Sequence, residues 1–315
     1  MAMLRAMDSA VAGLRAHQNK MDVIGNNIAN VNTWGFKAQS YNFKEAMYQT
    51  ATASTGGVAT GDNTSGGVNA AQYGYGSLTG SISTDMSASV PSYVGGLNAF
   101  IQGDGFFITS PTLKGETVDP TSTEDMKAAS FQYTRVGQFQ IDSNGYLQDL
   151  NGNYVYGFRT DDGKGDTIPE GAQLEPLRVP VKAGGFADGD SDDLAILTNV
   201  TIDKNGMIKG VGEDENGEET TFYLGKVGIA NFQNPNGLTK EGGGYYTASA
   251  SDNTGDVAAN VPGGDGLMAG YIETSNVDLA KEFSEMITTQ RGFQANSKVI
   301  TVSDEMLSDL LSMKR

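Results

Sequence analysis

Apolar side chains recur along the first thirty positions at spacings that alternate between four and three residues. This heptad pattern is typical of a helix that presents one narrow stripe to a partner helix. The stripe consists of Met3, Met7, Ala10, Leu14, His17, Met21, Ile24, Ile28 and Val31. Asn30, Asn32 and Gly35 then supply stop signals. The pattern therefore predicts a long helix over 3–31.

The last forty residues repeat the same alternation. The second stripe consists of Leu279, Phe283, Met286, Gln290, Phe293, Ser297, Ile300, Asp304, Leu307 and Leu311. Ser275 and Asp278 form a start signal for this helix, with Asn276 as the rival cap. The polar members of the stripe lower helix stability but fix register and partner choice.

Neither helix can bury its stripe alone. The two helices can pair with each other in a simple hairpin, or each can pair with copies of itself in an assembly. The spacing of the stripes permits both arrangements.

The chain between the helices is predicted to be β-rich. Residues 50–70 are rich in Gly, Ser, Thr and Ala and indicate a linker or an extended arm. From about 71 to 270, short runs typical of strands are separated by Asn-Gly pairs, the strongest local hairpin signal. The pairs lie at 144–145, 151–152, 205–206, 216–217 and 236–237.

These elements predict an α+β fold with terminal helices forming a coiled-coil domain and barrel- or sandwich-like β domains between them. The predicted division has four parts. They are 1–33 together with 275–315 as the helical domain, 34–75 as a linker or extended arm, 76–158 together with 223–274 as an inner β domain, and 159–222 as a small outer β domain.

Composition narrows the classes of function. The formal net charge is −17, nearly all of it between 51 and 274, and such an acidic surface disfavours nucleic acid and anionic lipid as partners. The chain has no cysteine, which excludes disulfides, thiolate metal sites and cysteine nucleophiles. The first twenty residues lack the apolar core of a secretory signal, and no apolar run is long enough to span a membrane.

The candidate chemistry is sparse. The single histidine, His17, falls on the first stripe, where a packed role is favoured over a catalytic one. Asp142 and Asp203 begin segments that resemble calcium loops, but neither has the Glu that would complete the loop, so a hairpin turn is the better interpretation. Residues 103–106 form only a weak phosphate cradle.

The remaining acidic cluster, at 188–193, is interpreted as a solvated loop in preference to a loose cation site. We therefore predict no catalytic residues, no cofactor and no metal.

Four stretches resemble the flagellar rod and hook protein family. Two of them are terminal, 6–37 and 273–307, with the marks Asn26-Asn27-Ile28-Ala29-Asn30 and Gly35-Phe36-Lys37 in the first and Ser275-Asn276-Val277-Asp278 and Gln290-Arg291-Gly292-Phe293 in the second. Two internal stretches, IQGDGFF (101–107) and YTRVGQFQIDSNGYL (133–147), match as well. The resemblance touches both ends and much of the middle.

The resemblance implies a structural subunit that polymerises with itself into a helical tube outside the membrane, with both terminal helices lining a central export channel. Within the family, the match at YVYGF (154–158) and the further β block favour the hook, a flexible joint that passes torque from rod to filament. The distal rod protein is the alternative. A secreted β-rich adhesin that binds glycan or calcium, and a muralytic enzyme, are the competing classes; the sequence shows clear marks of neither.

The resemblance also implies partners and an export route. The expected partners are the distal rod, the hook–filament junction proteins, the hook cap during assembly and the flagellar type III export apparatus, with export without a cleaved signal. The predicted assembly residues are Met7, Leu14, Met21, Ile24, Ile28, Asn26, Asn27, Asn30, Leu279, Phe283, Met286, Phe293, Ile300 and Leu307. Gly157 and Gly225 are the predicted hinges at the crossings into the outer β block, because glycine permits backbone rotation at low steric cost.

Overall fold

The computed structural model describes residues 2–60, 63–113, 118–160, 163–169, 171–183, 185–186, 194–262 and 266–313. The chain divides into two compact units. Unit 1 comprises Met1–Val31, Ala38–Asp85 and Val277–Arg315, and unit 2 comprises Asn32–Lys37 and Met86–Asn276. The fold is α+β, as the sequence predicts, with the terminal helices packed on each other and a β-rich middle.

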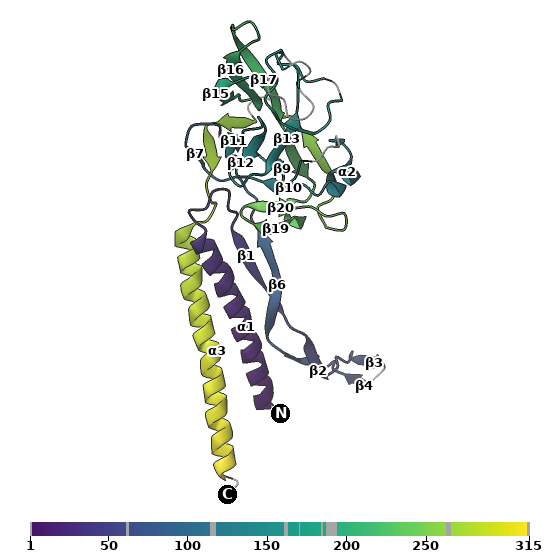
Figure 1. Ribbon diagram of the computed structural model, residues 1–315. Coiled ribbons are helices and arrows are strands. Elements are labelled where there is room, and N and C mark those ends of the chain that lie inside the picture. The colour runs from purple at the N-terminus through teal and green to yellow at the C-terminus, as the bar shows by residue number, and fades with distance from the viewer. Residues whose placement is uncertain are drawn as a thin grey trace. The chain divides into compact units, whose positions relative to one another are not determined.

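Unit 1 is built on two long helices, α1 (Ala2–Ala29) and α3 (Leu279–Met313), which lie side by side and run antiparallel (Figure 1). The carboxylate of Asp278 caps α3, accepting hydrogen bonds from the backbone N–H groups of Ala280 at 2.9 Å and Lys281 at 3.2 Å. Asp278 itself is thus the capping side chain, in place of Ser275 or Asn276. Among the described residues no helix is long and apolar enough to cross a bilayer.

A two-stranded antiparallel ribbon forms the rest of unit 1. Its pairs are β1 (Gln39–Glu45) with β6 (Ser77–Thr84), β2 (Tyr48–Thr52) with β5 (Ala71–Gly74), and β3 (Val58–Thr60) with β4 (Asn63–Ser65). The segment 50–70, predicted to be a linker or an arm, is the distal half of this ribbon (Figure 1). Residues 77–84, assigned from the sequence to the inner β domain, pair with β1 instead.

The root of the ribbon lies against α1. Asn19 on α1 donates to the Thr79 hydroxyl at 3.2 Å, and the Tyr41 hydroxyl donates to the same oxygen at 2.8 Å. An isolated two-stranded ribbon is marginal in water, so this packing against a helix is what supports β1 and β6.

Unit 2 contains the remaining strands and two short helices. In its first half these are β7 (Pro91–Tyr93), β8 (Ala99–Ile101), β9 (Phe106–Ser110), α2 (Thr123–Ala128), β10 (Gln132–Thr134), β11 (Phe139–Ile141), β12 (Leu147–Asp149), β13 (Tyr154–Phe158) and β14 (Glu175–Pro176). In its second half they are β15 (Leu197–Ile202), β16 (Met207–Glu213), β17 (Glu219–Val227), β18 (Ile229–Phe232), η1 (Pro235–Gly237), β19 (Thr239–Gly242), β20 (Tyr245–Thr247), β21 (Val257–Asn260), β22 (Leu267–Ala269) and β23 (Tyr271–Glu273).

The main sheet of unit 2 runs in the order β15-β16-β17-β13-β9-β10-β20-β19. Strand β9 is buried on both faces and separates two hydrophobic cores. Phe107 points into one core, and Phe106 and Ile108 point into the other. The alternation follows from the period of two along a strand. Val155 and Tyr156 divide in the same way on neighbouring β13.

Four hairpins of unit 2 share the turn Asp-x-Asn-Gly. In each turn the glycine has a positive φ and donates its N–H to the carbonyl of the aspartate three residues earlier, at 2.9–3.1 Å. The turns occupy 142–145, 149–152, 203–206 and 214–217. The Asn-Gly hairpin predictions at these four sites are confirmed, and glycine is required because other residues rarely adopt this backbone region.

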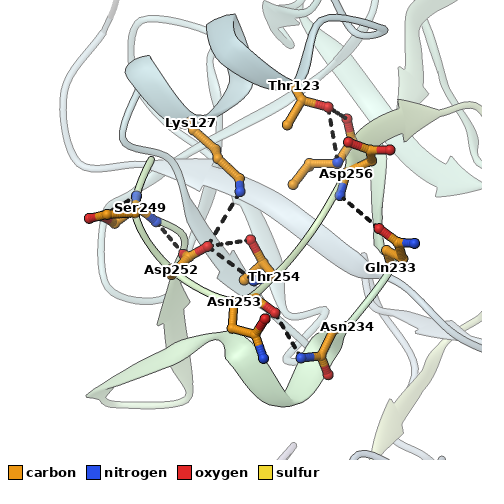
Figure 2. Close-up of polar contacts among 11 residues, drawn as sticks. Thr123, Lys127, Gln233, Asn234, Ser249, Asp252, Asn253, Thr254 and Asp256 are labelled. Atoms are coloured by element: carbon orange, nitrogen blue, oxygen red, sulfur yellow. Dashed lines mark hydrogen bonds and ion pairs between the residues drawn. The ribbon is translucent and has the colours of Figure 1, made fainter.

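The loop that follows β20 is tied to α2 through one carboxylate (Figure 2). Asp252 accepts hydrogen bonds from the backbone N–H groups of Ser249 and Thr254 and from the Thr254 hydroxyl, and it pairs with Lys127 at 3.3 Å. Burial alone would raise the pKa of Asp252, but these donors outweigh it and hold the pKa below its ordinary value. The charged form of Asp252 is therefore part of the folded structure.

Asp252→Asn should lower the stability of unit 2 by about 1–3 kcal/mol at neutral pH, the usual cost of weakening hydrogen bonds to a charged group. A depressed folded pKa gives stability that is complete above the unfolded pKa of about 3.9 and is lost as pH falls through the folded pKa. In thermal melts, the gap between wild type and variant should close in acid. Asp256→Asn, at an exposed carboxylate, is the control. A gap that persists unchanged in acid would contradict the assignment.

Candidate functional site: the helix pair and the junction segments

The helices α1 and α3 approach closely where each has a glycine. A Cβ on Gly13 would lie 2.7 Å from Nδ2 of Asn296, and a Cβ on Gly292 would lie 2.7 Å from Cε1 of His17. Real Cβ atoms essentially never come that near, so the two glycines set the distance between the helices at these points.

A buried hydrogen-bond network closes the other end of the helix pair. The Asn27 amide donates to the Gln39 carbonyl at 2.8 Å and to Glu282 Oε1 at 3.1 Å, and its oxygen accepts from the Gln39 N–H at 2.9 Å. Burial raises the pKa of Glu282, and the bond from Asn27 opposes that rise. Asn27 thus links α1, the root of the ribbon and α3.

His17 is a packed residue on the helix seam, as its place on the stripe predicts. Its ring lies edge-on to Phe43 with centroids 5.3 Å apart, and it faces Gly292 of α3. Burial, followed by the charge of Lys20, lowers the pKa of His17. Lys20 itself pairs with Glu285 of α3 at 3.0 Å.

The predicted stripe on α1 is at least partly buried along the positions whose side chains are described. Ile24 is buried, Met7, Leu14, Met21 and Ile28 are partly buried, and of the three asparagines Asn27 is buried, Asn30 partly buried and Asn26 exposed. The α1 residues that contact α3 include Gly13, His17, Lys20 and Asn27.

On α3 one of the two predicted rows of the stripe lies on the covered side. Met286, Phe293, Ile300 and Leu307 are partly buried. The other covered row lies one residue before the predicted one and consists of Glu282, Thr289, Asn296 and Ser303. Leu279 and Phe283 are exposed.

An apolar stripe on α3 therefore stays uncovered within the single chain. Phe283 is 50% exposed and Ile287 is 53% exposed, and with Leu279 they repeat at intervals of four residues, which places them on one face. Val302, Met306 and Leu310 form a second exposed apolar row nearer the end of the helix.

Three stretches of unit 2 continue directly into unit 1 and are called the junction segments: 32–37, 86–90 and 273–276. One ion pair joins them. Lys37 Nζ lies 2.7 Å from Glu273 Oε1 and donates to the Ser87 carbonyl at 2.6 Å, while the Ser89 N–H donates to the same Glu273 oxygen at 3.0 Å. The Lys37 and Glu273 side chains are 0% and 1% exposed.

Backbone and hydroxyl bonds add to this ion pair. The Gly35 N–H donates to the Glu273 carbonyl at 2.8 Å, and the Asn276 N–H donates to the Phe36 carbonyl at 3.4 Å. The Ser89 hydroxyl lies 3.0 Å from both the Thr274 hydroxyl and the Ser275 carbonyl. All three junction segments are thus bound to one another.

The two internal family stretches reach the same ion pair. Arg135 Nη1 donates to the Gly103 carbonyl at 2.8 Å and lies 3.8 Å from Glu273 Oε2. Its guanidinium carbon lies 5.2 Å from the centroid of the Phe106 ring. Residues from all four family stretches therefore meet around Glu273. The sequence identifies Lys37 as part of a family motif but assigns no role to Lys37, Arg135 or Glu273. The signal that could have identified this cluster is that each of these family stretches contains a charged residue.

The two predicted hinges lie in paired strands. Gly157 on β13 pairs with Val227 of β17, and a Cβ there would lie 2.2 Å from the Lys226 carbonyl oxygen. Gly225 has a φ of +131°, and a Cβ there would lie 2.3 Å from the Phe158 carbonyl oxygen. Both glycines permit a close approach of β13 and β17, and their hinge role stays a prediction.

Asp142 and Asp203 begin hairpin turns, and their carbonyls accept from Gly145 and Gly206 at 2.9 Å. The acidic cluster at 188–193 lies entirely outside the residues that the structure describes. Within the described ranges no group of three or more His, Cys, Asp or Glu side chains has the geometry of a metal site.

Two family models match the ends of the chain. The model described as "Flagella basal body rod protein" covers residues 7–37, and the one described as "Flagellar basal body rod FlgEFG protein C-terminal" covers 268–313. These two ranges contain Lys37 and Glu273, so the ion pair joins the two matched ends.

Curated relatives match along the whole chain. The flagellar basal-body rod protein FlgG of Bacillus subtilis is 38% identical over 99% of this chain and 100% of its own length. FlgG of Caulobacter vibrioides is 31% identical over 96% and 97%. The flagellar hook protein FlgE of Borreliella burgdorferi is 28% identical over 99% and 100%, in an alignment of 451 residues. The chain belongs to the flagellar rod and hook protein family, whose members are structural components of the flagellar axis.

The helix seam can be tested with two glycines that differ only in their surroundings. Gly25 has no atom within 4 Å of a built Cβ, so Gly25→Ala should stabilise α1 by up to about 1 kcal/mol through helix propensity. Gly292→Ala gains the same propensity but displaces the His17 ring, so it should raise the melting midpoint less or lower it. Far-UV circular dichroism melts of the two variants measure the difference. Equal gains would contradict the close approach at Gly292.

Proposed function

We propose that this protein is a structural subunit of the flagellar hook, which polymerises into a helical tube and transmits torque from rod to filament. The main observation in favour of polymerisation is the exposed apolar stripe of α3. Leu279, Phe283 and Ile287 remain exposed in the single chain, although α3 already has a partner helix. Contiguous exposed apolar surface marks sites of association, and membership of a polymerising family supports a second copy as the partner.

The assembly surface proposed from the sequence is retained and can be divided by role. Residues on the covered sides of α1 and α3, such as Leu14 and Phe293, shape the helix pair, and exposed residues such as Leu279 and Phe283 contact neighbouring copies. An interface that is built partly from buried and partly from exposed members of one heptad pattern is expected when each helix has two neighbours.

The hook is supported by relatives named hook proteins that align with the chain from end to end. The division of the chain into two units also fits a tube that bends, because relative motion of domains concentrates at a few connecting residues. We include Gly157 and Gly225 as candidate positions for such motion within unit 2.

The distal rod is the second candidate, and a specific observation favours it. The relatives named rod proteins match this chain at up to 38% identity among those compared, in alignments close to its own length of 315 residues. A rod subunit would use the same helix pair and the same stripe in a straight tube.

The proposed role is structural, not enzymatic. Its partners would be further copies of the chain, the neighbouring rod and junction proteins, the hook cap and the flagellar type III export apparatus. Its location would be the extracellular part of the flagellum.

Phe283→Asp should abolish tube formation while leaving the melting of the single chain nearly unchanged. The reason is that this half-exposed side chain contributes little inside one subunit, whereas an unpaired charge buried between subunits is strongly unfavourable. Sedimentation of assembled tubes and circular dichroism melts measure the two effects. Asn216→Asp, at the exposed β16–β17 turn, adds the same charge as a control. If Phe283→Asp formed normal tubes, the exposed stripe of α3 would not be a contact between subunits.

Electron microscopy of tubes grown from purified protein separates the two candidates. A hook subunit should form tubes that curve, because the hook bends while it rotates, and a rod subunit should form straight, stiff tubes. A strain lacking the protein gives an independent result. Basal bodies with a complete rod and no hook are expected for the hook, and basal bodies with an incomplete rod are expected for the distal rod.

A further inference from the structure

The junction segments are where force enters unit 2. The chain passes between the units at four points, after Val31, Lys37, Asp85 and Asn276, and each point borders a junction segment. Any tension that the covalent chain transmits between the units therefore acts first on the contacts of these segments. Those contacts centre on the Glu273 carboxylate, which binds Lys37 and the Ser89 N–H.

We propose that the Lys37–Glu273 ion pair is a clasp that holds the three junction segments together when the assembled tube carries torque. The proposal rests on the proposed function as far as torque is concerned. The clasp itself is a property of the single chain and can be measured without a flagellum.

The chemistry of the pair suits a clasp better than it suits a hydrophobic contact. Replacing a buried ion pair by apolar side chains of similar size often leaves stability unchanged or raises it, so thermal stability alone does not account for burying Lys37 and Glu273. An ion pair with fixed hydrogen-bond partners forms in only one arrangement of the junction segments relative to one another. Lys37 donates to the Ser87 carbonyl at 2.6 Å and to Glu273 at 2.7 Å, and both bonds are made in this one arrangement of the segments.

The contacts that would remain without the pair include backbone and hydroxyl hydrogen bonds between uncharged groups, which are weaker than bonds between charged groups. Between segments 32–37 and 273–276 they include the Gly35–Glu273 backbone bond at 2.8 Å and the Asn276–Phe36 bond at 3.4 Å, the second at the long end of the usual range. Segment 86–90 would keep the Ser89 hydroxyl contacts and two bonds to the Val90 carbonyl, from the Thr274 N–H at 3.3 Å and from the Thr274 hydroxyl at 2.8 Å. Its tie to Lys37 through the Ser87 carbonyl would be lost.

Force spectroscopy on the full chain tests the clasp directly. The chain has no cysteine, so Ala6→Cys and Asp309→Cys would provide two unique attachment points near its ends. Once the helices of unit 1 have peeled apart, tension reaches unit 2 at Asn32 and Asn276 and loads the junction segments. The quantity measured is the lifetime of unit 2 at constant force.

The decisive variant combines Lys37→Met with Glu273→Leu. Because Arg135 and the Ser89 N–H also lose the Glu273 carboxylate, we expect a small fall in its thermal midpoint, while its lifetime under force shortens about tenfold, which corresponds to about 1.4 kcal/mol. Glu273→Gln keeps an acceptor for Lys37 and Ser89 but removes the charge, so its lifetime under force should fall between those of the wild type and the double variant. Lys164→Met, which breaks the exposed Lys164–Asp214 pair in the same unit, is the control and should match the wild type.

A double variant with the wild-type lifetime would overturn the clasp. If the double variant does not melt cooperatively, Glu273→Gln decides, and a wild-type lifetime for that variant overturns the proposal equally. In cells, Glu273→Gln should still assemble tubes but swim disproportionately slowly in viscous medium. A chain that resists force through the clasp yet forms no tube in its wild-type form would contradict the proposed function alone.

Discussion

The fold depends on one buried carboxylate. Glu273 stands at the end of β23, just before the chain leaves for α3, and it binds Lys37, which stands where the chain leaves for the ribbon. A buried charge is tolerated only when it is paired and hydrogen-bonded, so each partner constrains where the other can be. Because Ser89 and Ser87 bind the same pair, the three junction segments must come together for the whole network to form. Residues from the start and the end of the sequence are thereby fixed in one small volume of the β-rich unit.

The helix pair follows a different principle. Glycines lie at its closest points, Gly13 and Gly292, and the Asn27–Glu282 bond lies at one end. One covered row of α3 is polar, with Glu282, Thr289 and Ser303 buried, while Phe283 and Ile287 remain exposed. Burial of apolar surface is the main driving force for association, and here the apolar side chains of Leu279, Phe283 and Ile287 stay exposed in the single chain. The single chain is thus suited to be a component, because its lowest-energy surroundings include its neighbours.

The sequence predicted what is local. Both helices follow from their heptad spacing, and four hairpins follow from Asn-Gly turns. The start signal of α3 was recognised, but its capping side chain is Asp278 and not Ser275 or Asn276. For one row of the α3 stripe, the covered residues lie one position before the predicted ones. The spacing of apolar residues cannot show that the helices come close at glycines and cover polar residues there. The pairing of β1 with β6 joins positions about forty residues apart in a segment of low hydrophobicity, where periodicity is weak. The Lys37–Glu273 pair spans 236 residues, and nothing in the pattern near either residue identifies its partner.

The repeated Asp-x-Asn-Gly turns bear on how this architecture changes over evolutionary time. Each turn is closed by its own aspartate and glycine and makes its hydrogen bond within four residues, so the two flanking strands can lengthen or a longer excursion can replace the tip without disturbing either core. The entropic cost of a longer surface loop grows only slowly with its length. Hook relatives that need 451 and 471 alignment positions to span these 315 residues are consistent with such growth. Subunits with β-rich units of very different size could therefore share one architecture, in which the chain ends that meet at Glu273 stay the same.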